Sequence, residues 1–206
     1  WAVGGNGMIY KYNGITWTKV TSSVIGTSSI YSLVASSESD IWVSGIGEFF
    51  HFDGVNWTVY TVAASNIYSM SMVSPSEIYA VDYHGRLLKW NGIGWAEIAI
   101  TTTYNGYSQV FAFSSNNIWL RSNKYLHNYN GNQLQLLNDD NSSIKCFDMV
   151  NSNEAWAADY KIYFYNGTNW KEVQNPINSS ITCIEMLNSK SGWAIGAYGE
   201  ILRYKE

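Results

Sequence analysis

The sequence is short of charge, and above all of grouped positive charge. Charged residues make up 14% of the 206 residues, against roughly 25% in an average soluble domain. The net charge is −4, and Arg occurs only at Arg86, Arg121 and Arg203. Electrostatic capture of a phosphate backbone needs clustered Lys and Arg side chains. We therefore expect no nucleic-acid partner.

Long apolar runs are also missing. No stretch approaches the roughly 18 consecutive apolar residues that indicate a membrane span, so we expect no membrane insertion. No leader pattern opens the chain. The first residue, Trp1, already lies inside a repeat, and we therefore expect a processed or trimmed chain. The missing leader pattern consequently does not indicate a compartment.

Cysteine is scarce. Cys146 and Cys183 hold the same place in successive repeats. Equivalent positions of neighbouring repeats usually lie too far apart for the geometry of a disulfide. A disulfide stays open as an alternative, but we expect two small buried thiols that stand where earlier repeats have Ser32 and Ser69.

Aromatic residues, by contrast, are abundant and periodic. They make up 16% of the chain, with 10 Trp and 16 Tyr. One aromatic word recurs at intervals of 41, 37, 40, 37 and 37 residues, at Trp1, Trp42, Tyr79, Trp119, Trp156 and Trp193. A period of this length is typical of propellers and solenoids, in which one supersecondary unit is copied because it cannot bury its apolar face alone.

Each full repeat divides into four short segments, which we name A to D. Segment A is apolar and β-rich: Ile30–Val34, Ile67–Val73, Tyr107–Phe113, Ile144–Val150 and Ile181–Leu187. Segment B holds the aromatic word: Trp1–Gly4, Ile41–Gly45, Ile78–Val81, Ile118–Leu120, Ala155–Ala158 and Gly192–Gly196. Segment C follows a turn: Met8–Tyr12, Glu48–Phe52, Arg86–Trp90, Tyr125–Tyr129, Lys161–Tyr165 and Glu200–Tyr204. Segment D begins near Trp17, Trp57, Trp95, Leu134 and Trp170.

An Asn-Gly or Asp-Gly pair separates segments C and D in five copies. The pairs begin at Asn13, Asp53, Asn91, Asn130 and Asn166. Such pairs tolerate positive φ and are strong hairpin signals. Strands of about five residues without a 3.6-residue period indicate an all-β fold. We predict a β-propeller of four-stranded antiparallel blades that forms a single domain over residues 1–206.

The number of blades follows less directly. Segments B and C occur six times, but segments A and D only five. We expect six blades, of which the first lacks its inner strand and the last its outer strand. Five blades, or a stretch of a larger ring, remain alternatives. Unpaired end strands would also allow self-association with another chain.

The stretch from Trp1 to Trp17, WAVGGNGMIYKYNGITW, resembles the Trp-rich repeats of bacterial β-propellers. Among these are tectonin-type lectin repeats and the Asp-box repeats of sialidase-like propellers. The Gly-x-Thr-Trp half of the Asp-box is present at Gly14–Trp17, whereas Tyr10 and Tyr12 replace its Ser and Asp. The resemblance implies a sugar-binding recognition protein. Its motifs are structural, and they carry no chemistry.

Catalytic constellations are not apparent. The three His residues, His51, His84 and His127, fall on different strand positions, and no zinc spacing occurs. We expect no enzyme activity, no cofactor and no metal site. A sialidase-like hydrolase that uses the three Arg residues is the enzymatic alternative. Asp139, Asp140 and Asn141 have oxygen atoms that suit Ca²⁺, but such clusters are more typical of turns.

Loops on a rigid scaffold are the usual place for binding residues. In a four-stranded blade, the B-to-C and D-to-A connections share one face, and Tyr, Asn and Asp side chains gather there. Aromatic rings suit the CH-rich surfaces of sugars, and amides and carboxylates suit their hydroxyls. The candidate ligand-binding residues are Tyr83, His84, Tyr104, Asn105, Asn138, Asp139, Asp140, Tyr160, Lys161 and Tyr198.

These observations predict a non-enzymatic recognition module on a secreted or cell-surface protein. Its expected partner is a glycan or a protein. The alternative is a structural or assembly propeller that contacts other proteins through its faces or its unpaired end strands.

Overall fold

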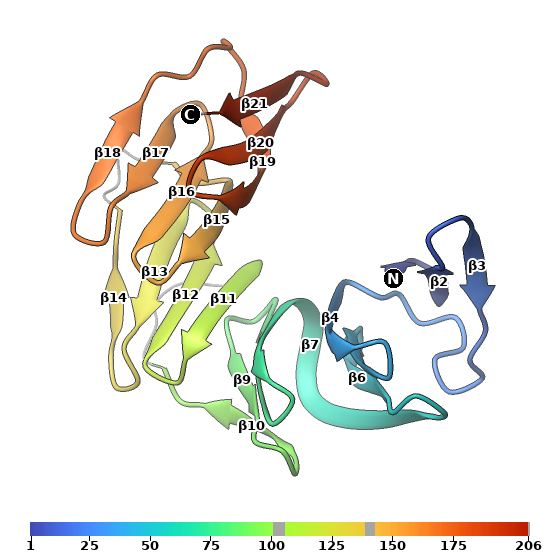
Figure 1. Cartoon of the computed structure of the whole chain (residues 1–206). Helices are drawn as coiled ribbons and strands as arrows, with labels where there is room; N and C mark the ends of the chain where they lie inside the picture. The colour runs from blue at the N-terminus through green and yellow to red at the C-terminus, as the bar shows by residue number, and fades with distance from the viewer. Residues whose placement is uncertain (101–105, 139–142, 206) are drawn as a thin grey trace. The chain divides into compact units, whose positions relative to one another are not determined.

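The computed structural model describes residues 1–100, 106–138 and 143–205, and β-strands are the regular elements there (Figure 1). Within these residues no helix is long and apolar enough to cross a membrane. The chain divides into two compact units, Trp1–Ala112 and Phe113–Glu206. Whether these units form the expected single domain stays a prediction.

The first unit holds a three-stranded and a seven-stranded sheet, both antiparallel. The three-stranded sheet consists of β1 (Ala2–Gly4), β2 (Met8–Tyr12) and β3 (Trp17–Val20). The seven-stranded sheet consists of β4 (Ser32–Ser37), β5 (Asp40–Ser44), β6 (Ile46–Phe52), β7 (Trp57–Ser74), β8 (Glu77–Asp82), β9 (Leu87–Trp90) and β10 (Trp95–Ile98).

The division between the units falls inside β11 (Gln109–Ser114). The sheet that begins there continues with β12 (Asn117–Ser122), β13 (Tyr125–Tyr129) and β14 (Leu134–Leu136). The next four-stranded sheet consists of β15 (Cys146–Asn151), β16 (Glu154–Ala158), β17 (Ile162–Tyr165) and β18 (Trp170–Val173). The last sheet has three strands, β19 (Ile181–Asn188), β20 (Ser191–Gly196) and β21 (Ile201–Lys205).

The strands follow the segments expected from the repeat. The two complete four-stranded sheets run in chain order, so segments A to D are consecutive neighbours. The first sheet holds segments B, C and D, and the last sheet holds segments A, B and C. The predicted all-β, four-stranded antiparallel architecture is therefore confirmed. The blade number stays a prediction.

Strand β7 differs from the expectation of short, separate strands. It runs for 18 residues and joins a segment D to the following segment A. Its first part pairs with β6 from Trp57 to Thr61, and its second part pairs with β8 from Ile67 to Ser74. Two blade-like sheets thereby become one seven-stranded sheet. The residues between carry no Gly or Pro that would stop the strand.

The Asn-Gly and Asp-Gly pairs form the expected hairpins, but only the Gly of each pair adopts the positive φ that the sequence analysis associates with the pair. The Gly residue adopts positive φ, as at Gly14 (96°) and Gly167 (90°). The preceding Asn or Asp does not, and acts through its side chain instead. Asp53 Oδ1, for example, accepts N–H bonds from Val55 (2.9 Å) and Asn56 (2.7 Å). These bonds form an Asx-turn and lower the pKa of the Asp53 carboxyl.

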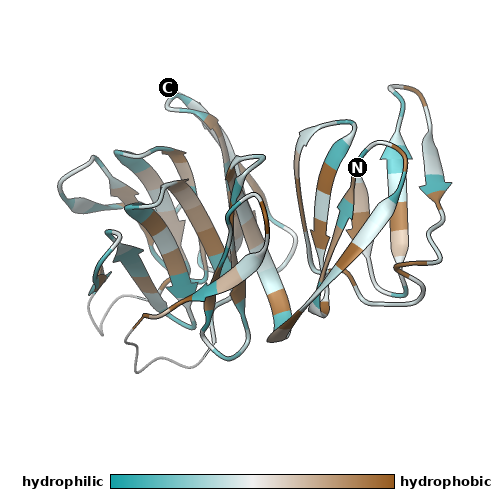
Figure 2. Ribbon diagram, turned by 90° about the horizontal axis from the view of Figure 1, so that it is seen from below, coloured by the Kyte–Doolittle hydropathy of each residue, from teal (hydrophilic) through white to brown (hydrophobic). Residues whose placement is uncertain are grey.

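The aromatic word of segment B is mainly a packing device, as predicted. Trp42, Tyr79, Trp119 and Trp156 are buried, whereas Trp193 is 42% exposed. Hydrophobic and hydrophilic stretches are interspersed along the strands (Figure 2), and in β11 buried and partly exposed residues alternate, with Val110 and Ala112 buried. The segment B strands β5, β8 and β16 are buried nearly throughout, and their side chains therefore make up much of the hydrophobic core.

Inner strands are tied to one another by side chains of segment A. Ser32 Oγ accepts the N–H of Met70 (3.0 Å), and Ser69 Oγ accepts the N–H of Val110 (3.2 Å). Cys146 takes the same place and is buried, as expected, but Cys183 is exposed. The expectation of two buried thiols is thus wrong for Cys183, because the described residues put no further inner strand against β19. Both cysteines are free thiols.

Candidate functional site

A row of aromatic rings lies beside the turn that follows β8 in the first unit. The ring of Tyr31, just before β4, meets Tyr68 of β7 edge to face, with centroids 5.4 Å apart. Tyr68 meets Tyr83 in the same way at 6.2 Å, and Tyr83 meets His84 at 5.5 Å. Tyr83 is 57% exposed and Tyr31 is 38% exposed. We name these four residues the aromatic row.

The loop under the aromatic row is held by a buried carboxylate. Asp82 is fully buried at the end of β8. Its Oδ1 accepts the N–H groups of His84 (3.0 Å) and Arg86 (2.9 Å). Its Oδ2 accepts the N–H of Ser65 (3.1 Å) and lies 2.8 Å from Arg86 Nη2. A carboxylate with this many donors fixes the turn that carries Tyr83 and His84.

Arg86 completes this clamp. Its Nε donates to Asp82 Oδ2 (2.9 Å), and its Nη1 donates to the carbonyl of Ala63. The backbone of Tyr83 also donates to the carbonyl of Asn66 (3.0 Å). The turn after β8 is thereby joined to the middle of β7. The aromatic row consequently rests on a rigid base, which favours recognition because little order has to be gained on binding.

Sequence reasoning found one half of the aromatic row and missed the other. Tyr83 and His84 were predicted, and the structure brings them together. Tyr31 and Tyr68 lie in segment A, which the sequence predicts as a strand. The available signal was their spacing, since both directly follow the first residue of segment A in successive repeats.

The second unit holds the other described candidates, at separate turns. Tyr160 and Lys161 line a hollow with Asn175 and Asn178. Lys161 Nζ is paired with Glu172 at 2.8 Å. Tyr198 is almost fully exposed in the turn before β21, where its N–H donates to Glu200 (2.9 Å).

Asn138 has a structural role. Its Oδ1 accepts the N–H of Leu126 (2.6 Å), and its Nδ2 donates to the carbonyl of Lys124 (3.1 Å). Both ends of the amide thus serve the start of β13. Four predicted residues, Tyr104, Asn105, Asp139 and Asp140, lie outside the described residues. The calcium alternative, which rested on Asp139, Asp140 and Asn141, lies there as well.

The histidines and arginines have local structural partners. His51 Nε2 lies 2.7 Å from Asp40 Oδ1. Burial lowers the pKa of His127 to about 4, so that this ring is neutral near pH 7. Arg121 donates to the carbonyl of Asn123 (3.0 Å), and Arg203 lies over the ring of Trp193. Across the described residues, no group of three or more His, Cys, Asp and Glu side chains has the arrangement of a metal site.

Comparison with known proteins identifies the fold. No family model matches the sequence, and a search of curated proteins gives no match. Solved structures are similar, however. YCF48 from Cyanidioschyzon merolae matches with a TM-score of 0.78 and 15% identity, over 98% of this chain and 76% of that one. The fold is that of a β-propeller.

Two further solved structures show the same fold. YCF48 bound to D1 peptide has a TM-score of 0.67 and 14% identity, over 85% of this chain and 63% of that one. The extracellular domain of BT4673 from B. thetaiotaomicron has a TM-score of 0.76 and 11% identity, over 99% of this chain. The match covers 31% of the BT4673 chain. Identities this low establish the fold alone.

Proposed function

We propose that this propeller is a non-enzymatic recognition module that binds a peptide segment of a partner protein across the aromatic row. The observation that carries the proposal is the row itself, four rings from three separate segments that meet at the loop ends. Tyrosine supplies a large amphipathic contact surface at low entropic cost. The Asp82–Arg86 clamp provides the rigid base. A solved structure with the same fold, YCF48, is bound to a peptide.

A glycan is the second candidate ligand, and one contact favours it. Asn66 Nδ2 lies 3.4 Å from the hydroxyl of Tyr68, so an amide stands beside the rings. Ring faces with an adjacent amide suit a pyranose. The resemblance to tectonin-type repeats points the same way. We also propose a secreted or cell-surface location, since a propeller of the same fold is the extracellular domain of BT4673.

Two screens on the intact chain separate the ligand classes. In the first, a phage-displayed library of linear peptides is selected on the immobilised protein. In the second, the labelled protein is applied to a glycan array. Peptide or glycan hits are then titrated by calorimetry against the wild type and Tyr83→Ala. Tyr83 is exposed, so its truncation leaves the core intact.

We expect Tyr83→Ala to weaken the bound ligand at least roughly tenfold, as for an aromatic hot spot. The matched control is Val55→Ala, because Val55 is 81% exposed in the β6–β7 hairpin of the same unit. Hits that bind Tyr83→Ala and the wild type equally would contradict the proposal, and an empty result in both screens would count against recognition altogether.

A further inference from the structure

A polar groove lies between two sheets of the second unit, those of β11–β14 and β15–β18. Its volume is about 700 Å³, and ligand sites usually have roughly 300–1,000 Å³. None of the described residues that line the groove is charged. Amide side chains line it from both sheets, and we name it the amide groove after them: Asn116, Asn117, Asn128, Gln135, Asn153 and Asn169.

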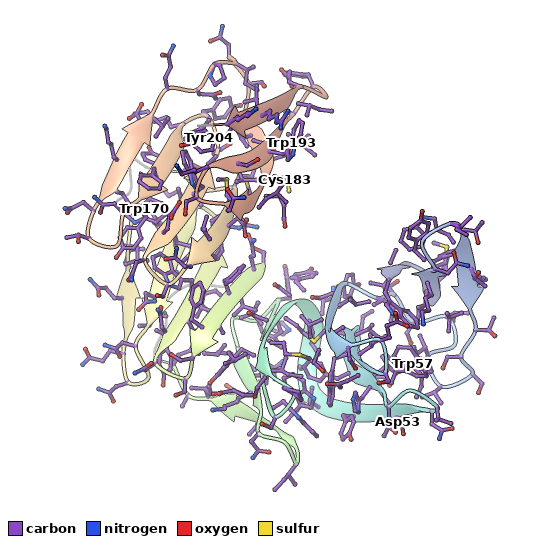
Figure 3. The ribbon with its side chains drawn as sticks, viewed as in Figure 1. Asp53, Trp57, Trp170, Cys183, Trp193 and Tyr204 are labelled. Atoms are coloured by element: carbon purple, nitrogen blue, oxygen red, sulfur yellow. The ribbon has the colours of Figure 1, made fainter. Side chains whose placement is uncertain are left out.

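One row of side chains crosses the first of these sheets and faces the groove. Trp119 of β12 stands opposite Asn128 of β13, which in turn stands opposite Gln135 of β14. Directly opposite residues of antiparallel strands project to the same face of the sheet. The second sheet contributes the rings of Tyr165 and Trp170, which lie 5.3 and 6.3 Å from the ring of Trp119. Figure 3 shows Trp170 at the start of β18, close to the sheet that holds β14.

The place opposite the segment B aromatic differs in this repeat. In the second and third repeats it holds a basic residue that pairs with an acid two residues before the aromatic, at 2.7 Å in His51–Asp40 and 2.8 Å in Lys89–Glu77. Here both places hold Asn, and Asn128 Nδ2 donates to Asn117 Oδ1 (3.0 Å). Two amides thus replace the basic and acidic partners. The groove is consequently neutral where the two earlier repeats carry ionisable groups.

Several amide atoms in the groove keep their hydrogen-bonding capacity. Asn117 Oδ1 also accepts Trp119 Nε1 (2.8 Å), so the amides of Asn117 and Asn128 are held in place. Asn117 Nδ2, Asn128 Oδ1 and both ends of the Gln135 amide make no hydrogen bond within the described residues. Uncharged donors and acceptors therefore lie side by side. Because the two asparagines are already ordered, they lose little entropy on binding a ligand.

The chemistry of these atoms favours a neutral saccharide. Each sugar hydroxyl both donates and accepts a hydrogen bond, and an amide offers one group of each kind. The CH-rich faces of pyranose rings suit aromatic side chains, and the partly exposed rings of Tyr165 and Trp170 lie beside the amides. An ionic ligand would find no opposite charge among the described lining residues.

We propose that the amide groove binds a short neutral oligosaccharide. Asn117 Nδ2 donates to one sugar oxygen, and Asn128 Oδ1 and the Gln135 amide hold neighbouring hydroxyls. One pyranose ring packs against Trp170. The groove belongs to the second unit and the aromatic row to the first, so this site stands whether or not the aromatic row binds a peptide.

Three uncharged probes that differ in linkage and substitution test the ligand class: maltohexaose, cellohexaose and chitohexaose. Each is titrated into the isotope-labelled full chain, and NMR follows the side-chain amide signals of Asn128 and Gln135, assigned by single substitutions. We expect saturable shifts of these signals with at least one probe. Hexagalacturonate, an anionic chain of the same length, is the control for charge and should not bind.

Two variants test the groove itself. Gln135→Ala removes a donor and an acceptor and should weaken saccharide binding about three- to tenfold. Its matched control is Gln133→Ala, because Gln133 is exposed in the same β13–β14 hairpin and does not line the groove. The double variant Asn117→Glu, Asn128→Lys rebuilds the pair that the third repeat has in Glu77 and Lys89. It should fold and lose saccharide binding, because it fills the groove and removes the free amide atoms.

Binding that Gln135→Ala weakens, the double variant loses and Gln133→Ala keeps would support the proposal. Unchanged signals with all three saccharides at millimolar concentration would overturn it, and so would equal affinities of the wild type and the double variant. Saccharide binding that is lost in Tyr83→Ala instead would place the sugar on the aromatic row and overturn the groove. Shifts caused by selected peptides and by none of the saccharides would overturn it in favour of a peptide. The thermal melt of each variant verifies that it is folded.

Discussion

His51 lies flat on the indole of Trp42, with ring centroids 4.3 Å apart and planes 15° from parallel. The two residues face each other across β5 and β6. Other repeats use the same place for another side chain: Lys89 lies over Tyr79, Phe164 packs on Trp156, and Arg203 lies over Trp193. In these four repeats the aromatic of segment B is thus covered within its own sheet by a cation or a ring, whereas Trp119 faces Asn128.

This cover gives a stability prediction for His51. His51→Ala removes the stacked ring and the contact with Asp40, and we expect a loss of about 1–2 kcal/mol in the free energy of unfolding. His51→Lys should lose less, because Lys already occupies this place over Tyr79. Urea unfolding followed by Trp fluorescence measures both. Equal losses of unfolding free energy in His51→Ala and His51→Lys would contradict the claim that the side chain over Trp42 stabilises the fold.

The Asp82 clamp predicts a larger effect. Asp82→Ala leaves the guanidinium of Arg86 and the N–H groups of Ser65 and His84 without their acceptor. Removing one partner of a buried ion pair costs about 3–5 kcal/mol. Hydrogen exchange should also show faster exchange of these amides. The double variant Asp82→Ala, Arg86→Met tests whether the unpaired guanidinium causes the loss. Because it removes that charge, it should recover part of the lost free energy of unfolding.

Asp148 predicts a stability that falls with rising pH. Burial raises the pKa of this carboxyl, although the Met186 N–H, 2.6 Å from Oδ2, opposes the shift. The unfolded chain therefore ionises Asp148 at a lower pH than the folded chain does. Ionisation costs folding free energy, and the cost grows from the unfolded pKa to the folded pKa and stays constant above it.

Asp148→Asn keeps an oxygen for Met186 and cannot ionise. We expect a higher melting temperature than wild type at pH 7 and no difference at about pH 3, below the ordinary pKa of Asp. Melting curves by circular dichroism across this range provide the measurement. A variant that is less stable than wild type at pH 7 would contradict the sign.

The two cysteines should differ in reactivity. Burial raises the pKa of Cys146 to about 12, and its side chain is covered, whereas Cys183 is exposed. We expect maleimide to modify Cys183 in the native protein, and Cys146 only after unfolding. Mass spectrometry of peptides after timed labelling distinguishes the two. Cys183→Ser provides the control, since it should leave a native protein without labelling.

The sequence contained enough to predict the architecture, because the signals were local and repeated. The aromatic of segment B marks each buried strand, and pairs such as Asn13-Gly14 mark the hairpins through short-range hydrogen bonds. The continuous strand β7 was not predictable in this way. Its two parts pair with different neighbours, the first with β6 and the second with β8, and this pairing is a tertiary effect.

The candidate site was less visible for a similar reason. Tyr68 is a good β-former within a strand, and the place that it shares with Tyr31 in successive repeats does not reveal that its ring meets Tyr31 and Tyr83. The sequence around Asp82 is typical of a turn. Only the structure shows that its carboxylate accepts hydrogen bonds from the backbone N–H groups of Ser65, His84 and Arg86 and from Arg86 Nε. The exposure of Cys183 likewise depends on which strand lies beside it, and not on the residue itself.

The central claim is that a ligand lies on Tyr31, Tyr68 and Tyr83, and fluorine NMR tests it most directly. The protein is labelled with 3-fluorotyrosine, and its signals are assigned by single Tyr→Phe variants. A peptide from the selection is then added in steps. Shifts confined to the three row tyrosines, with Tyr12 of β2 unchanged, are the result that we predict. Unchanged signals from the row at saturating ligand, or shifts at Tyr12 instead, would contradict the account.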